Sequence, residues 1–135
     1  MKVMDNIKYL RRVLLTGATV FGLSAVLLLI SPSLFNELLG VSATPYLDWA
    51  MRMIGLTLVA LAGNMLSVSL KGKDSAVIFS ARVMAISAFG LGVLTLLIPV
   101  ATLTWFDYAY AAVGFGFSLA YIVGLLRARK AQPAG

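Results

Sequence analysis

The stretch DWAMRMIGLTLVALAGNMLSVSL, residues 48–70, is the part of the chain around which the rest is interpreted. It is long enough to cross a bilayer, whose hydrocarbon core needs about 20 apolar residues in a helix. Within it lie Arg52, four residues after Asp48, and Asn64 further in. Polar groups are rare inside membrane helices and usually face protein rather than lipid. This stretch therefore predicts a transmembrane helix that also carries the best candidates for a functional site.

The composition of the whole chain is typical of an integral membrane protein. Of the 135 residues, 61% are hydrophobic and 12% are charged, and the mean hydropathy is +0.97. Soluble domains contain about 45–50% apolar and about 25% charged residues. The sequence has no cysteine and no histidine, which excludes disulfides, thiolate chemistry, bis-histidine haem ligation and most zinc sites. We therefore expect no metal and no cofactor.

Hydrophobic runs separated by helix breakers predict an all-α membrane fold, a four-helix bundle in a single domain over residues 1–135. A basic lead-in, residues 1–12, is expected at the membrane interface, and its apolar residues share one helical face with Leu14. Asp74 or Ser75 is expected to cap the third span. The predicted spans are residues 13–30, 49–70, 76–98 and 108–126, followed by a basic, flexible tail at residues 127–135.

The connection between the first two spans contains a helix breaker at each end. Ser31-Pro32 is expected to end the first span, because proline lacks an amide proton and restricts the residue before it. Residues 34–39 then place four apolar side chains at helical spacing, and Gly40 stops the pattern. We expect a short amphipathic helix that lies on the membrane surface.

The loop charges predict the orientation. Lysine or arginine precedes the first span, lies between the second and third, and follows the fourth, whereas the other two connections contain neither. By the positive-inside rule, both termini are then cytoplasmic, as in a protein of a bacterial-type inner (plasma) membrane. The net charge of +6 does not indicate nucleic-acid binding, because basic residues at the edges of apolar runs contact anionic lipids. Membrane lipids are thus expected partners.

The two halves of the chain resemble each other, which predicts a parallel 2+2 internal repeat. Their second spans align without a gap, and the axis that relates the halves would run along the membrane normal, with any ligand site between them. The matching positions are Asp48, Trp49, Ala50, Gly55 and Lys71 in the first half and Asp107, Tyr108, Ala109, Gly114 and Lys130 in the second.

Small residues predict how the spans pack, because membrane helices associate through close contact of such faces. Tyr110, Phe117 and Tyr121 lie on a face offset from the small residues of the last span, where they meet lipid, line a ligand cleft or contact another protein. We expect packing through Ala109, Ala112, Gly116, Ala120 and Gly124 of the last span and through Ala81, Ala85, Ala88 and Gly92 of the third.

Arg52 is the leading binding candidate, and two interpretations remain open. Its guanidinium either reaches the outer headgroups or pairs with Asp48, one turn away. Alternatively it faces the bundle interior and holds an anionic headgroup, a carboxylate or quinone-type oxygen, or an acidic residue of a partner. The repeat places Ala111 at the corresponding position of the second half, so the architecture itself does not require an arginine there.

The other polar residues have structural and functional interpretations as well. Asn64 is expected to bond across helices, with a pore ligand as the alternative. Asp48 and Asp107 form either a symmetric outer pair across the repeat or two helix N-caps. Arg82 is expected to reach the inner headgroups. The sequence has no P-loop, GxSxG or HExxH motif and no paired intramembrane carboxylates, so we expect no catalytic residue and no enzymatic activity.

The chain resembles small uncharacterised four-helix membrane families of the DoxX-like kind. The resemblance lies in a proline-terminated first span, a short connection containing LLG, and a second span that opens with Asp48, Arg52 and Gly55 in a D-x-x-x-R-x-x-G pattern. Some DoxX relatives are associated with quinone-linked thiosulfate oxidation. That activity is not carried over, because no cofactor ligand or redox residue supports it here.

Three functional hypotheses follow, in this order. The first is a non-catalytic accessory or assembly subunit of a larger membrane complex, whose partners are other membrane subunits or copies of itself. The second is a small transporter, channel or lipid- or quinone-binding protein that uses a cleft near Arg52. The third is a membrane enzyme that acts on lipid or quinone.

Overall fold

The computed structural model describes residues 2–131, and within this range the chain is helical apart from short connections. Four of the five helices are long and apolar enough to cross a membrane, as the sequence predicts, and residues 2–131 contain no strand. The helices are α1 (Lys2–Ile30), α2 (Pro32–Leu38), α3 (Pro45–Lys71), α4 (Asp74–Leu96) and α5 (Trp105–Ala131).

The predicted breakers around α2 are confirmed. Ser31 leaves the helical conformation, with φ −141° and ψ 70°, and Pro32 begins α2. Gly40 has a φ of 77°, a left-handed conformation that glycine adopts without a steric penalty. α2 does not lie flat on an exposed surface, however, because its Phe35 and Asn36 are buried against the bundle.

The ends of the long helices differ from the predicted bounds. α3 begins four residues early at Pro45, since Thr44 caps it by accepting a hydrogen bond from the Leu47 amide and proline suits the first helical position. The N-cap of α4 is Lys73, without a side-chain bond, so neither Asp74 nor Ser75 caps this helix. The predicted flexible tail is wrong for residues 127–131, which continue α5, and residues 132–135 lie outside the described range.

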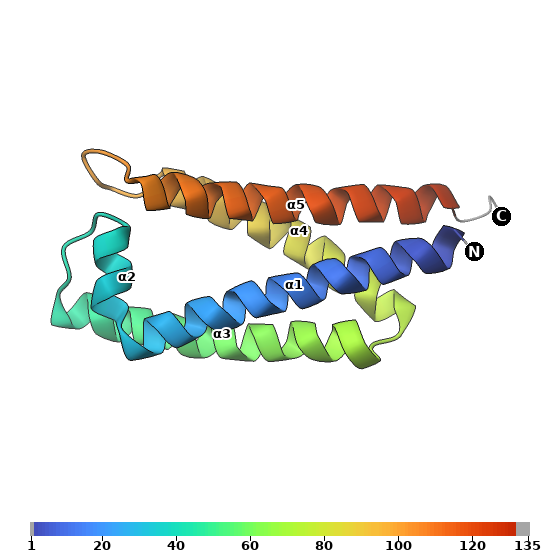
Figure 1. Cartoon of the computed structure of the whole chain (residues 1–135), viewed down its shortest axis with the longest axis horizontal. Coiled ribbons are helices and arrows are strands. Elements are labelled where there is room, and N and C mark those ends of the chain that lie inside the picture. Colours follow the sequence, from blue (N-terminus) through green and yellow to red (C-terminus); the bar gives the residue numbers. More distant parts are fainter. Residues whose placement is uncertain (1, 132–135) are drawn as a thin grey trace.

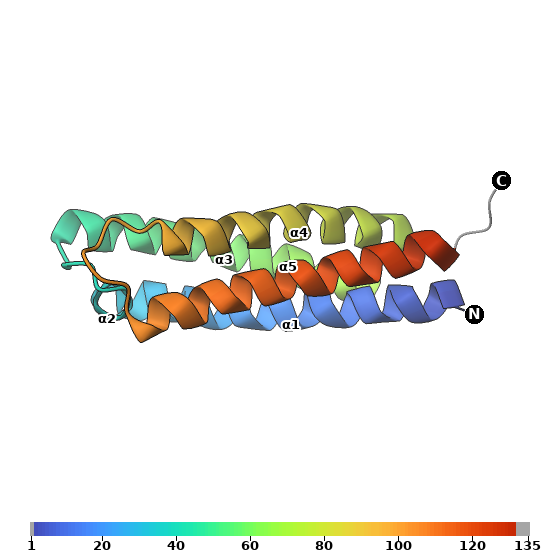
Figure 2. The same ribbon diagram turned by 90° about the horizontal axis from the view of Figure 1, so that it is seen from above.

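The long helices form two hairpins, α1–α3 and α4–α5 (Figure 1). α1 also packs against both helices of the α4–α5 hairpin. α3 and α4 follow each other in the chain but make few contacts. Figure 2 shows the bundle from above, with α5 in front of α1. Both ends of the described chain and the α3–α4 turn lie at one end of the bundle, hereafter the basic end. α2 and the α4–α5 connection lie at the other, the acidic end.

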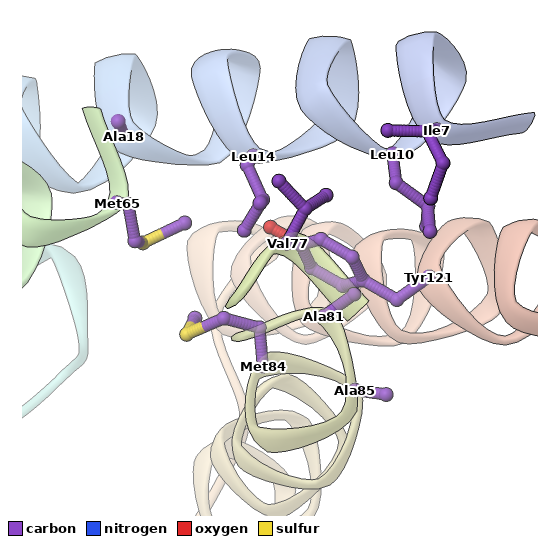
Figure 3. Close-up of a cluster of buried hydrophobic side chains, with 10 residues drawn as sticks. All are labelled: Ile7, Leu10, Leu14, Ala18, Met65, Val77, Ala81, Met84, Ala85 and Tyr121. Atoms are coloured by element: carbon purple, nitrogen blue, oxygen red, sulfur yellow. The ribbon is translucent and has the colours of Figure 1, made fainter. Parts of the chain in front are cut away.

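The core lies where α1 meets the other three long helices (Figure 3). Ile7, Leu10 and Leu14 share a face, as predicted, but this face packs on protein, so the lead-in is part of the core rather than an interfacial segment. The core members are Ile7, Leu10, Leu14, Ala18, Met65, Val77, Ala81, Met84, Ala85 and Tyr121.

The predicted small-residue face of α4 is confirmed, because Ala81, Ala85, Ala88 and Gly92 are all buried. On α5 the prediction is wrong for Gly116, where a Cβ would meet nothing within 4 Å, and for the exposed Ala109 and Ala112, while Ala120 is only half-buried. Gly124 is buried, but against Tyr9 and Leu10 of α1. α5 instead packs through Ala111, Gly114, Ser118, Tyr121 and Ala128.

Arg11 ties α1 to the α3–α4 turn. Its guanidinium donates to the carbonyl oxygens of Val68, Ser69 and Gly72, at 2.7–3.2 Å, and forms an ion pair of 3.0 Å with Asp74. A cation at the last carbonyls of a helix also interacts favourably with the helix dipole. A basic residue of the lead-in was expected to reach the headgroups. Arg11 instead binds the end of α3 and stabilises the basic end of the α1–α3 hairpin.

Candidate functional site

A lateral groove lies between α3 and α4 because these two helices diverge. Its volume is about 270 Å³, and it is open on one side. The walls are mainly apolar, and the exposed ring of Phe79 forms part of them. The lining residues are Leu61, Asn64, Met65, Val68, Ala76, Phe79, Ser80, Val83 and Met84. We call this surface the α3–α4 groove.

Asn64 is the polar residue of the groove that the sequence singles out. It lies seven residues before the end of α3, about 10 Å along the axis, and is therefore in the half of the helix that belongs to the basic end, about midway between that end and the middle. Its side chain is exposed and donates only to the Ala60 carbonyl of its own helix, at 2.9 Å. The predicted bond across helices is therefore wrong within the described chain.

Ser80 lies on the opposite wall of the groove. The turn between α3 and α4 is short, and Ser80 follows it by about as many residues as Asn64 precedes it, so both residues are at a similar depth. Ser80 was not predicted from the sequence. The available signal was its position opposite Asn64 across the turn.

Arg52 is exposed on α3, and within residues 4–130 its side chain has no hydrogen bond or ion pair. The expected pairing with Asp48 is absent, and the Asp48 carboxylate has other donors. Its Oδ1 accepts from Asn36 Nδ2 at 3.0 Å, and its Oδ2 accepts from Ser33 Oγ at 2.8 Å. Arg52 thus faces away from the described bundle. The interpretation in which its guanidinium faces the bundle interior is not observed.

Asp107 and Thr104 form a reciprocal cap at the start of α5. The Thr104 amide donates to Asp107 Oδ2 at 2.8 Å, and the Asp107 amide donates to Thr104 Oγ1 at 3.3 Å. This is the capping-box arrangement. The N-caps of α3 and α5 are therefore Thr44 and Thr104, and neither Asp48 nor Asp107 occupies that position, contrary to one of the two interpretations.

Two buried acceptor oxygens remain without a partner at the acidic end: Asn36 Oδ1 and Asp107 Oδ1. The two residues belong to neighbouring elements, because Thr104 Oγ1 donates to the Leu38 carbonyl of α2 at 2.7 Å and the rings of Phe35 and Phe106 are in edge contact. α2 therefore joins the first hairpin, through Asp48, to the start of α5.

Tyr110 and Tyr121 line a small cavity of about 30 Å³ between α1 and the second hairpin. Tyr121 is only 1% exposed, so lipid is excluded as its environment, and its hydroxyl has no partner. Tyr110 stacks on Phe106 and contacts Phe35 edge-on. The cavity has room for one or two water molecules, and Gly17 forms the wall nearest the Tyr121 hydroxyl.

No group of three or more aspartates and glutamates within the described residues is arranged to hold a metal ion. Comparison with protein-family models, with curated proteins and with solved structures found no significant match for this chain.

Proposed function

We propose that this chain is a non-catalytic accessory or assembly subunit of a larger membrane complex. The observation that carries the proposal is Asn64, an exposed amide within a membrane-spanning helix that bonds only to its own helix. Hydrocarbon offers such a group no partner, and polar side chains in membrane helices commonly bond to neighbouring helices. A transmembrane helix of a partner subunit in the α3–α4 groove would supply that bond.

The location and orientation belong to the same proposal. The chain lies in a bacterial-type inner (plasma) membrane with both termini in the cytoplasm, because ten of its eleven lysines and arginines belong to the basic half of the bundle and only Arg52 to the acidic half. This distribution agrees with the positive-inside rule. Trp49 and Trp105, 65% and 72% exposed at the acidic end, suit the opposite interface.

The internal repeat and the DoxX-like resemblance are further parts of the proposal. Support for a repeat comes from the pairing of helices, since each half contributes one hairpin. The aligned glycines, Gly55 and Gly114, each lie against the preceding long helix of their own hairpin. The resemblance to DoxX-like families rests on Asp48, Arg52 and Gly55 alone.

Crosslinking from the groove tests the proposed partner. Phe79, 69% exposed in the groove, is replaced by the photo-crosslinking amino acid p-benzoyl-phenylalanine, and Leu119, 62% exposed on α5 outside the groove, receives the same replacement as the control. We expect a covalent adduct with one specific membrane protein from position 79 and none from position 119. Adducts with lipid alone at both positions would contradict the proposal.

Co-purification in mild detergent gives a second readout. The native chain is expected to elute with stoichiometric partner subunits, and Asn64→Leu is expected to lose them. The matched control, Ser67→Ala, changes an exposed polar residue of the same helix that does not line the groove. Isolation of the wild-type chain alone would overturn the accessory role.

A small lipid-binding protein or transporter is the second candidate function. The observation that favours it is the buried, unpartnered Tyr121 hydroxyl at the cavity between the two hairpins, because an unpaired buried hydroxyl is costly. A cavity of this size holds no organic ligand unless the hairpins separate. A small molecule that co-purifies with the wild type but not with Tyr121→Phe would favour this function over the first.

A further inference from the structure

A second groove lies between α4 and α5 at the basic end. It has a volume of about 340 Å³ and is lined by Ile78, Arg82, Leu125, Leu126, Ala128 and Arg129. Two of these six residues are exposed arginines from different helices. Apolar side chains from both helices form the remainder of the wall, and Leu126 is itself 53% exposed. The groove thus combines two cations with an apolar surface.

The two arginines line the same groove although their backbones lie at different depths. The helices are antiparallel, and Ser118 Oγ donates to the Ala85 carbonyl at 2.8 Å, which places these two residues at the same level. Arg129 then lies near the level of Asp74, the first residue of α4, and Arg82 lies eight residues further in, about 12 Å along the axis. The polar interface of a leaflet is only about 5–8 Å thick, so an Arg82 side chain that reaches the headgroups must extend back along the groove towards Arg129.

No acidic side chain compensates these charges within residues 4–130. The acidic residues of the basic end are Asp5 and Asp74, and Asp74 is paired with Arg11. Arg82 and Arg129 have no hydrogen-bond or ion-pair partner in the described chain. Two like charges that line one partly apolar groove repel each other, and an anion between them removes that repulsion.

We propose that this groove binds the phosphate of an anionic phospholipid, with Arg82 and Arg129 donating to the phosphate oxygens. Guanidinium groups match phosphate geometry with two parallel hydrogen bonds, and basic pockets between membrane helices bind anionic headgroups. The depth of Arg82 and the exposed Leu126 beside it select a lipid over a soluble phosphate, because an acyl chain continues from the headgroup along the apolar wall. The proposal is independent of the accessory role.

The test is a lipid titration of the purified full chain in detergent, followed by native mass spectrometry. The probes are phosphatidylglycerol and phosphatidylcholine with identical acyl chains. We expect tighter binding of phosphatidylglycerol, and each Arg→Gln change at position 82 or 129 is expected to weaken it about fivefold, or about 25-fold together, as expected for basic residues near a lipid surface. The matched control is Arg127→Gln with Lys130→Gln, which removes the same charge from exposed positions outside the groove.

Each other result overturns the proposal. Equal loss in the groove variant and the control variant would mean a diffuse charge effect, and equal binding of the two lipids by the wild type would mean no phosphate site. The wild-type comparison needs no substitution, so equal binding of the two lipids would overturn the proposal even if the variants fail to fold. Displacement of phosphatidylglycerol by millimolar inorganic phosphate would assign the arginines to a soluble anion instead.

Discussion

In the α1–α3 hairpin, side-chain hydrogen bonds lie at both ends of the helices, whereas in the α4–α5 hairpin the two helix backbones approach each other closely at Gly114. Arg11 fastens the basic end of the first hairpin, and Asp48 with its two donors fastens the acidic end. In the second hairpin, a Cβ on Gly114 would lie 2.9 Å from the Ala88 carbonyl oxygen. One hairpin is held by polar groups near the membrane surfaces, the other by close packing inside.

The difference shows that aligned positions need not have the same physical role. Gly55, which aligns with Gly114, lies mainly against side chains: a Cβ there would be 3.0 Å from the Leu28 Cβ and 3.4 Å from the Ala25 carbonyl oxygen. The Leu29 Cγ, 3.2 Å from a Cβ at position 55, can turn aside, whereas the three atoms nearest a Cβ at position 114 all belong to the backbone of α4 and move only with that helix. We therefore expect the two hairpins to respond differently to matched substitutions.

The largest effect is expected for Gly114→Val. The new side chain must push α5 away from α4, and overpacking of this kind costs up to about 3 kcal/mol. The measurement is the free energy of unfolding in mixed micelles of mild detergent and dodecyl sulfate, followed by circular dichroism. Gly55→Val should cost less, and Gly116→Val, where a Cβ meets nothing within 4 Å, should cost least. Equal costs at positions 114 and 116 would contradict the close backbone contact.

Arg11→Gln is expected to have the next largest effect, about 2 kcal/mol, because hydrogen bonds to charged groups contribute about 1.5–3 kcal/mol. The same unfolding measurement applies, with the exposed neighbour Arg12→Gln as the control. Asp74→Asn should cost little, because that carboxylate is 67% exposed and exposed ion pairs contribute at most about 1 kcal/mol. If Asp74→Asn matched Arg11→Gln, the carbonyl bonds would not be the source of the stability.

The smallest effect is expected for two serines that make the same bond in different hairpins. Ser118 Oγ donates to the Ala85 carbonyl and Ser69 Oγ to the Arg11 carbonyl, both at 2.8 Å. Ser118→Ala should lower the unfolding free energy by about 0.6 kcal/mol, the average for interhelical bonds in membranes. Ser69→Ala should cost less, since Arg11 still holds the same region. The exposed Ser87→Ala is the control, and a larger cost at Ser69 than at Ser118 would reverse the comparison.

The number of spans and the breaks between them were predictable because they depend on local chemistry. Pro32 and Gly40 act on the backbone of their own neighbourhood, and both breaks are observed. The rotation of α5 about its axis was not predictable from composition. Lipid and protein interior are both apolar, so Gly116 and Gly114 were equivalent as small residues until the position of α4 was known.

Two misjudged polar sites, Arg11 and the cap of α5, did have a signal in the sequence. Arg11 completes the i, i+3, i+4, i+7 pattern that begins at Ile7, so it lies on the buried face of α1 while Arg12 does not. Thr104 and Asp107 match the T-x-x-D form of a capping box. The surroundings of Asn64 carried no such signal, because the separation of α3 from α4 is a property of the whole bundle.

The contact between α1 and α5 has a consequence for how the chain is assembled during synthesis. Tyr9 donates from its hydroxyl to the Ala120 carbonyl at 3.1 Å, and Gly124 lies against Leu10. α1 leaves the ribosome long before α5. The Tyr9 hydroxyl therefore cannot form its bond to the Ala120 carbonyl until a segment more than a hundred residues later in the chain has been inserted. Arg11, beside it, finds its carbonyls as soon as α3 is inserted. Two nearby residues of one helix thus mark an early and a late step of maturation.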